Sequence, residues 1–230
     1  MSEPIDPRWP KILSLSVHEF RTPMTVVSGY LRMVLKEKAG PLNDQQRRLL
    51  EEAEKSCGRL TALLAEVSEL STLEAGTAAF NKQSTELNAV LATAMQQLPP
   101  LPDREVTIDL QLVDGQAPLR ADSVKLGQAL GAIVAALRRE LVTSDRLIVR
   151  ARRSAAQGSS SYEIFIGDDA AVAALAAEEV ASSATFDEWR GGVGLSLMTA
   201  RRILNAHGGT VHGPADGAKA SARILLPGSS

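Results

Sequence analysis

The chain has 230 residues, of which 44% are hydrophobic and only 3% aromatic, and its 27 acidic and 25 basic residues give a formal net charge of −2. A chain of this length can bury enough apolar surface for two domains of ordinary size. The balanced charge and the scarcity of aromatic rings argue against a nucleic-acid partner, which needs a basic face or a stacking surface.

The single cysteine, Cys57, excludes a disulfide within the chain and a cysteine metal site. The first ten residues lack the basic region and apolar run of a secretion signal. No run of about 18 apolar residues, the length that crosses a membrane, is present. We therefore expect a cytoplasmic protein without membrane insertion.

The first expected element is a helix over residues 9–38. Its apolar residues recur at spacings of three and four, at Leu13, Val17, Phe20, Met24, Val27, Leu31 and Val34. The pattern ends at Ala39-Gly40-Pro41, where glycine and proline are typical stop signals. His18 stands beside these apolar positions and is not one of them.

A second helix begins after Asn43 or Asp44, either of which can cap it, and ends near Glu74-Ala75-Gly76. The same spacing returns at Leu50, Ala53, Cys57, Leu60, Leu64 and Val67. Two long helices joined by a short turn predict an antiparallel hairpin. Such a hairpin covers its own apolar positions poorly, so we expect two copies to pair into a four-helix bundle. The alternative is that the C-terminal half of the chain covers them.

The pattern after residue 80 changes to short strands and separate helices. Alternating or continuous apolar residues predict strands at 106–112, 147–151, 162–166 and 221–226. Helical periodicity predicts helices at 122–140 and 195–206. We expect an α+β fold: the hairpin at residues 1–80, then an α/β sandwich at residues 81–230 with helices on one face of a mixed sheet.

The segment from His18 to Pro23 reads His-Glu-Phe-Arg-Thr-Pro. His18 and Thr22 are four residues apart and share a helix face, and Glu19 is next to the histidine. An imidazole is a good nucleophile toward phosphorus when a carboxylate holds its other nitrogen, and Glu19 is placed to do this. Thr22 can orient a water for the reverse, hydrolytic reaction. Pro23 removes a backbone donor and loosens the helix. The alternative is an ordinary solvated histidine.

The sequence His-Glu-Phe-Arg-Thr-Pro-Met-Thr from His18 closely resembles the phosphoacceptor motif of two-component sensor histidine kinases. Residues 191–209 resemble the family's second glycine box and the helix after it, and glycines at a helix N-terminus let backbone N–H groups approach phosphate. The resemblance runs from about residue 8 to 228. It implies ATP and Mg²⁺ as cofactors, the catalytic residues His18, Glu19 and Thr22, and the nucleotide-binding residues Arg139, Asp168, Gly192, Gly194 and Leu195. His207 and His212 are expected to be structural.

Residues 121–130 also resemble the lead-in to the family's asparagine box, but the box itself departs from the pattern. Ala136 occupies the position of the magnesium-binding asparagine, and Ala132 occupies the earlier asparagine position. Arg139 keeps the charge of the usual phosphate-contacting lysine. Because an alanine methyl cannot coordinate magnesium, we assign no metal ligand.

Residues 166–172 align with the first glycine box and make Asp168 the counterpart of the aspartate that recognises adenine. Both glycines of that box are replaced, by Ala170 and Val172, and side chains there crowd a backbone that must approach the nucleotide. Phe186 resembles the phenylalanine box, but only four residues separate it from Gly191. Most of the lid that closes over ATP is therefore expected to be missing.

Three functions remain open. The family resemblance implies a homodimeric histidine kinase core, in which ATP phosphorylates His18 and the phosphoryl group passes to an aspartate of a response-regulator receiver domain. The degraded boxes favour an ATP-independent histidine phosphotransferase or response-regulator phosphatase. The third possibility is a non-catalytic dimerisation partner. In each case we expect the signal to arrive from a separate sensor or input protein, or from a domain outside this chain.

Overall fold

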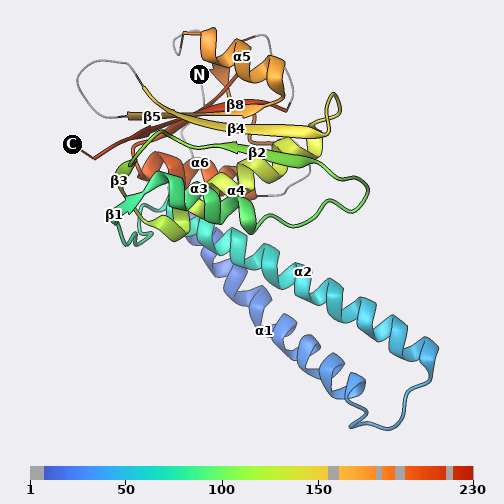
Figure 1. Cartoon of the computed structure of the whole chain (residues 1–230). Helices are drawn as coiled ribbons and strands as arrows, with labels where there is room; N and C mark the ends of the chain where they lie inside the picture. The colour runs from blue at the N-terminus through green and yellow to red at the C-terminus, as the bar shows by residue number, and fades with distance from the viewer. Residues whose placement is uncertain (1–7, 155–160, 180–182, 190–194, 216–219, 230) are drawn as a thin grey trace. The chain divides into compact units, whose positions relative to one another are not determined.

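The computed structural model describes residues 8–154, 161–179, 183–189, 195–215 and 220–229. The chain divides into two compact units, one ending at Ala78 and the other beginning at Ala79 (Figure 1). We call them the hairpin unit and the sheet unit and describe each by itself. No helix among the described residues has the length and apolar composition to cross a membrane.

The hairpin unit consists of helix α1, Trp9–Leu35, and helix α2, Asp44–Glu74, which confirms the two predicted helices. Helix α1 ends three residues earlier than expected, because Glu37 adopts a left-handed backbone with φ of 57°. Asn43 caps α2 in a capping box with Gln46. Arg47 fastens the turn, since it donates to the Leu35 carbonyl at 3.4 Å and pairs with Glu37.

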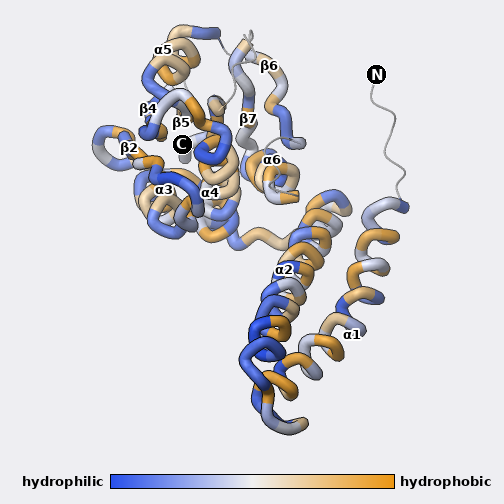
Figure 2. The backbone as a smooth tube through the Cα atoms, turned by 90° about the vertical axis from the view of Figure 1, so that its right-hand side faces the viewer, coloured by the Kyte–Doolittle hydropathy of each residue, from blue (hydrophilic) through white to orange (hydrophobic). Residues whose placement is uncertain are grey.

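The apolar positions of the hairpin divide into two groups. Val17 is buried, and Leu13, Met24 and Leu31 are half-buried. Phe20 and Val27 follow the same sequence spacing but remain 60% and 45% exposed. Hydrophobic residues are visible along both helices in Figure 2, and further exposed ones are Ile12, Tyr30, Met33, Leu49 and Leu60. A single hairpin therefore leaves a large part of its apolar surface uncovered.

The sheet unit contains a two-stranded and a six-stranded sheet. Strands β1, Gln83–Glu86, and β3, Pro118–Ala121, pair antiparallel. The large sheet has the order β2-β4-β5-β8-β7-β6, in which β2 and β4 are parallel and the other pairs, where described, are antiparallel. Its strands are β2 Thr107–Gln111, β4 Arg146–Arg153, β5 Ser161–Gly167, β6 Ala184–Thr185, β7 Thr210–Gly213 and β8 Ala222–Pro227. The mixed sheet and its four predicted strands are confirmed.

Helices α3, Leu87–Gln96, α4, Ser123–Glu140, and α6, Ser196–Ala206, cover one face of this sheet (Figure 1). The expectation that all helices share this face is wrong, because helix α5, Asp169–Ala177, lies on the opposite face. On that side Val172 and Leu175 of α5 form a buried cluster with the sheet residues Ile148 and Phe165. Six of the nine residues of α5 are alanine, so its sequence shows little periodicity.

His207, at the end of α6, joins three segments of the sheet unit. Its ring is buried, and Nε2 accepts a hydrogen bond of 3.0 Å from the Asp122 backbone N–H. Nδ1 lies 2.8 Å from the Ile203 carbonyl oxygen. The Nδ1–H tautomer satisfies both contacts. The ring of Phe80 packs against it edge to face, with centroids 5.2 Å apart. These contacts support the structural role expected for His207.

The variant His207→Ala is expected to lower the free energy of unfolding of the sheet unit by about 2–3 kcal/mol. The substitution leaves a cavity beside Phe80 and removes the acceptor of the Asp122 N–H. Urea unfolding followed by circular dichroism measures the loss. His212→Ala, at a half-buried histidine in β7, is the control and should cost less than about 1 kcal/mol. Equal costs for the two variants would contradict this role of His207.

Candidate functional site

His18 lies in the first half of α1 and points into solvent. Its side chain is 76% exposed, and its Nδ1 atom lies 3.6 Å from Oε1 of Glu19, which is 73% exposed. The carboxylate therefore faces Nδ1, the nitrogen nearer the backbone. Nε2 is left as the atom that an incoming group can approach.

Helix α1 keeps His18 and Thr22 on one face. Pro23 lies inside the helix and offers no N–H to the carbonyl of Glu19, four residues earlier. The helix nevertheless continues from Trp9 to Leu35, and the Thr25 hydroxyl donates to the Arg21 carbonyl at 2.9 Å. Thr22 follows His18 by one turn and is exposed. This is the placement expected from the sequence.

His18 and two exposed apolar residues of α1, Phe20 and Val27, lie on opposite sides of the helix. At 3.6 residues per turn, side chains two positions apart point about 160° away from each other. His18 therefore points away from Phe20, and Thr25 points away from Val27. We call the side that carries His18 and Thr25 the polar flank and the side that carries Phe20 and Val27 the apolar flank. The exposed Leu15, Val26 and Met33 lie between the two.

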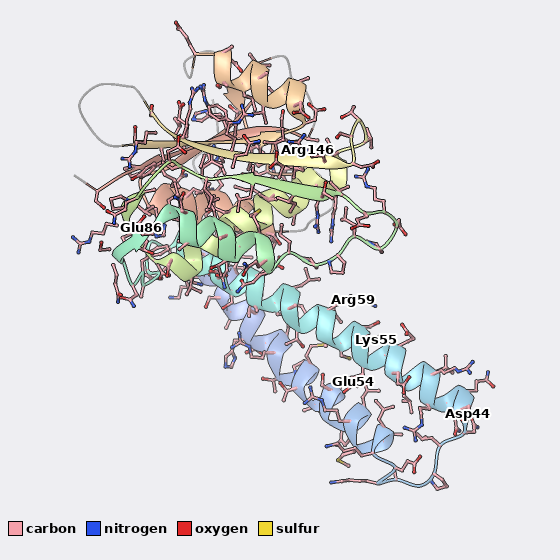
Figure 3. The ribbon with its side chains drawn as sticks, viewed as in Figure 1. Asp44, Glu54, Lys55, Arg59, Glu86 and Arg146 are labelled. Carbon is pink, nitrogen blue, oxygen red and sulfur yellow. The ribbon has the colours of Figure 1, made fainter. Side chains whose placement is uncertain are left out.

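A hollow of about 390 Å³ lies between α1 and α2, and residues one to four turns after His18 help to line it. Small residues leave this space, and at Gly29 no atom lies within 4 Å of the position that a Cβ would take. Arg21 and Arg32 lie at its edge, and Arg32 donates to Glu54, labelled in Figure 3, at 3.4 Å. The hollow was not expected, because its lining combines residues from two helices.

The residues assigned to a nucleotide site belong to separate elements of the sheet unit. Ala136 is a fully buried residue of α4, and Arg139 is exposed in the last turn of the same helix. Asp168 follows β5 and caps the N-terminus of α5. Leu195 stands immediately before α6. Gly192 and Gly194 lie outside the described residues.

These positions do not fit a magnesium nucleotide held in the way the motif implies. Ala136 supplies a methyl group that solvent does not reach, whereas Mg²⁺ requires oxygen ligands. Both carboxylate oxygens of Asp168 are engaged, because Oδ1 accepts the Ala171 N–H at 2.9 Å and Oδ2 accepts the Thr143 hydroxyl at 2.7 Å. Within the described ranges, no group of three or more His, Cys, Asp or Glu side chains is placed to hold a metal.

The Ala171 N–H and then the Thr143 hydroxyl lower the pKa of the Asp168 carboxyl below its ordinary value. Sequence reasoning missed Thr143. It lies 25 residues before Asp168 and belongs to no motif, so only the fold brings the two together.

The hairpin unit, which carries an exposed histidine beside a glutamate, is similar to a known phosphoacceptor domain. Residues 12–76 match the family model of the His Kinase A (phospho-acceptor) domain. The circadian input-output histidine kinase CikA of Synechococcus elongatus is 26% identical over 212 residues, which cover 87% of this chain and 27% of the relative. The cell-division control histidine kinase PdhS of Brucella abortus is 30% identical over 113 residues, 48% of this chain and 11% of the relative.

The chain is thus similar to a histidine kinase over most of its length, and most of its hairpin unit matches the His Kinase A (phospho-acceptor) domain model. It spans only about a quarter of the length of CikA and a tenth of that of PdhS.

Two solved structures, one of them of a histidine kinase, show the same fold. Full-length ShkA in complex with AMPPNP superposes with a TM-score of 0.65 at 21% identity, covering 95% of this chain and 45% of ShkA. Acinetobacter baumannii AdeS gives a TM-score of 0.52 at 17% identity, covering 93% of this chain and 98% of AdeS.

Proposed function

We propose that this chain takes up a phosphoryl group on His18 and exchanges it with an aspartate of a response-regulator receiver domain. The observation that carries this function is the exposed imidazole of His18, with Glu19 Oε1 facing its Nδ1 at 3.6 Å. A carboxylate at one ring nitrogen favours the tautomer whose other nitrogen carries the lone pair. Nε2 is then the nucleophile.

Glu19 and Thr22 have different roles in this proposal. Glu19 stabilises the positive charge that the ring gains when Nε2 bonds to phosphorus, because the carboxylate stays beside the Nδ1–H. Thr22 shares the exposed face of His18 and orients a water for hydrolysis of the receiver's phosphoaspartate. The same three residues then serve phosphoryl transfer and phosphatase chemistry.

We also propose that two copies of the hairpin unit pair into a four-helix bundle through the apolar flank of α1. That flank carries Phe20, Val27 and Tyr30, which are 45–63% exposed in the single chain. Burial of such side chains contributes about 1.5–3 kcal/mol each. Because His18 points away from this flank, pairing leaves its imidazole open to a receiver domain.

A second candidate is autokinase activity, with ATP as the donor and input from a separate sensor protein. The relationship to named histidine kinases favours it. One experiment tests phosphoryl chemistry in either case. The full chain is incubated with a radioactively phosphorylated receiver domain or with radioactive ATP, and acid-labile label is measured on the wild type and on His18→Gln. Label on the wild type alone supports the function, and equal label on both contradicts it.

The variant Glu19→Gln is expected to slow phosphorylation of His18 by about 10²-fold, because an amide cannot stabilise the charged ring. The measurement is the initial rate of label transfer from a phosphorylated receiver domain. Glu51→Gln, at an exposed glutamate of α2, is the matched control and should keep the wild-type rate. A wild-type rate for Glu19→Gln would remove Glu19 from the mechanism.

The variant Thr22→Ala is expected to keep the transfer rate but to slow loss of phosphate from the receiver to water by about 10-fold or more, since the hydroxyl acts only on the water. Release of inorganic phosphate over time separates the two reactions. Ser14→Ala, one turn before His18, is the matched hydroxyl control. Equal loss of transfer and hydrolysis in Thr22→Ala would show that Thr22 has no separate hydrolytic role.

A further inference from the structure

Helix α5 is fastened to the outer face of the sheet at its N-terminal end. Asp168 caps the helix by accepting the Ala171 N–H at 2.9 Å, and its second oxygen accepts the Thr143 hydroxyl at 2.7 Å. The next residue, Asp169, lies 3.9 Å from Arg146 of β4, which is labelled in Figure 3. The N-terminus of α5 is therefore held by both oxygens of one carboxylate and by a neighbouring ion pair.

Two arginines of the sheet hold the opposite end. Arg223 donates to the Glu178 carbonyl at 3.0 Å, and Arg152 lies 3.5 Å from the Ala176 carbonyl oxygen. Both guanidinium groups also pair with the buried carboxylate of Glu163, at 3.6 and 2.7 Å. They lie over the ring of Phe165, with its centroid 5.2 and 4.7 Å away. Cations at this end complement the negative C-terminus of the helix.

The middle of α5 is anchored by burial. Val172 and Leu175 are almost completely buried against Ile148 and Phe165. Val172 is the residue that stands where the first glycine box has a glycine. Val172, which replaces a glycine of that box, is therefore one of the two buried apolar residues that hold α5 against the sheet. We call the arrangement from Asp168 to Glu178, with its sheet partners, the α5 clasp.

We propose that the α5 clasp has replaced the adenine site, so that the sheet unit holds no nucleotide and His18 receives its phosphate from the phosphoaspartate of a receiver domain. An adenine amino group that reached Asp168 would have to share a carboxylate oxygen with the Ala171 N–H or the Thr143 hydroxyl. The magnesium position offers no compensating ligand, because Ala136 is buried and apolar. The inference about the donor rests on the proposed function of His18.

The transfer step balances without nucleotide or redox chemistry. The Nε2 lone pair of His18 attacks the phosphorus of the acyl phosphate, the N–P bond forms, and the bond from phosphorus to the aspartate oxygen breaks. The aspartate leaves as a carboxylate. The imidazole keeps its Nδ1 proton and becomes positively charged, beside Glu19.

Calorimetric titration of the full chain with AMPPNP and Mg²⁺ tests the absence of a nucleotide site. We expect no saturable heat up to about 1 mM, the upper end of common substrate affinities. Saturable binding in this range would overturn the proposal, whatever happens at His18.

The clasp itself is tested by the thermal unfolding of full-length variants. Asp168→Ala should lower the unfolding temperature by about 3 °C, because it removes the cap, whereas Asp168→Asn should restore most of the loss, since asparagine caps helices as well as aspartate. Thr143→Val, which removes only the hydroxyl, gives a second reading if Asp168→Ala does not fold. Wild-type unfolding of Asp168→Ala, or of Thr143→Val in that case, would overturn the structural role of Asp168.

Two parallel labelling reactions separate this inference from the proposed function. The donors are radioactive ATP with Mg²⁺ and the receiver domains of the source organism, each labelled with radioactive acetyl phosphate. We expect label on His18 from a receiver and none from ATP, with His18→Gln as the background. Label from ATP would overturn the inference and leave the function of His18 standing. Label from neither donor would contradict both.

Discussion

The variant His18→Gln is expected to carry no acid-labile phosphate above background. It should also remove no radioactive phosphate from a phosphorylated receiver domain. Glutamine fills similar space and is polar, but its amide nitrogen has no lone pair available to attack phosphorus. Because the histidine is 76% exposed, the substitution should change the free energy of unfolding by no more than about 0.5 kcal/mol. The loss is thus chemical and not structural.

The control for this variant is His212→Gln. His212 is the half-buried histidine of β7, where Nε2 lies 2.8 Å from the Thr210 hydroxyl. Burial and the neighbouring Arg223 and Arg201 lower its pKa, and it has no carboxylate contact comparable to that of His18 among the described hydrogen bonds and ion pairs. His212→Gln should keep wild-type labelling. Wild-type labelling of His18→Gln would show that phosphate enters the chain elsewhere.

The double variant Val27→Asp with Tyr30→Asp is expected to convert a dimer into monomers. The two side chains are 45% and 63% exposed on the apolar flank of α1. Each copy of the bundle would bury both, so four charged groups would enter one interface. A loss of about 1.5 kcal/mol per side chain weakens association by roughly 10⁴-fold. Sedimentation equilibrium of the full chain measures the change.

Thr25→Asp is the matched control for this interface. It adds a negative charge to the same part of α1, but two residues from Val27 and therefore on the polar flank. The wild type and Thr25→Asp should both sediment as dimers. A monomeric wild type, or a double variant that stays dimeric, would show that the apolar flank of α1 is not the pairing surface.

Periodic and continuous patterns of apolar residues predicted the long helices and the longer strands of the fold. Both helices of the hairpin and α4 repeat apolar residues every three or four positions, and β4, β5 and β8 are short apolar runs. Helix α5 was not predicted, because alanine on every side gives no contrast between a buried and an exposed face. The short strands β1, β3, β6 and β7 were also missed, since four or fewer residues carry too little periodicity.

The sequence predicts the arrangement around His18 better than the arrangement around Asp168. His18, Glu19 and Thr22 lie within five residues on one helix, so helix geometry alone places them together. The surroundings of Asp168 depend on its bond to Thr143, on the contact of Arg223 at the far end of α5, and on the packing of Val172. These contacts join different elements of the fold, so the local sequence does not predict them. Motif comparison therefore assigned Asp168 a nucleotide-binding role but could not predict that it also caps α5.

The most direct test of the central claim is to locate the phosphate on the wild-type chain. The full chain is incubated with every receiver domain encoded in the genome of its source organism, each phosphorylated with acetyl phosphate. Mass spectrometry at neutral pH, where phosphohistidine survives, then identifies the modified residue. We predict phosphate on His18 with at least one receiver. Phosphate on another residue, or on none with the complete set of receivers, would contradict the proposal that His18 exchanges phosphate with a receiver domain.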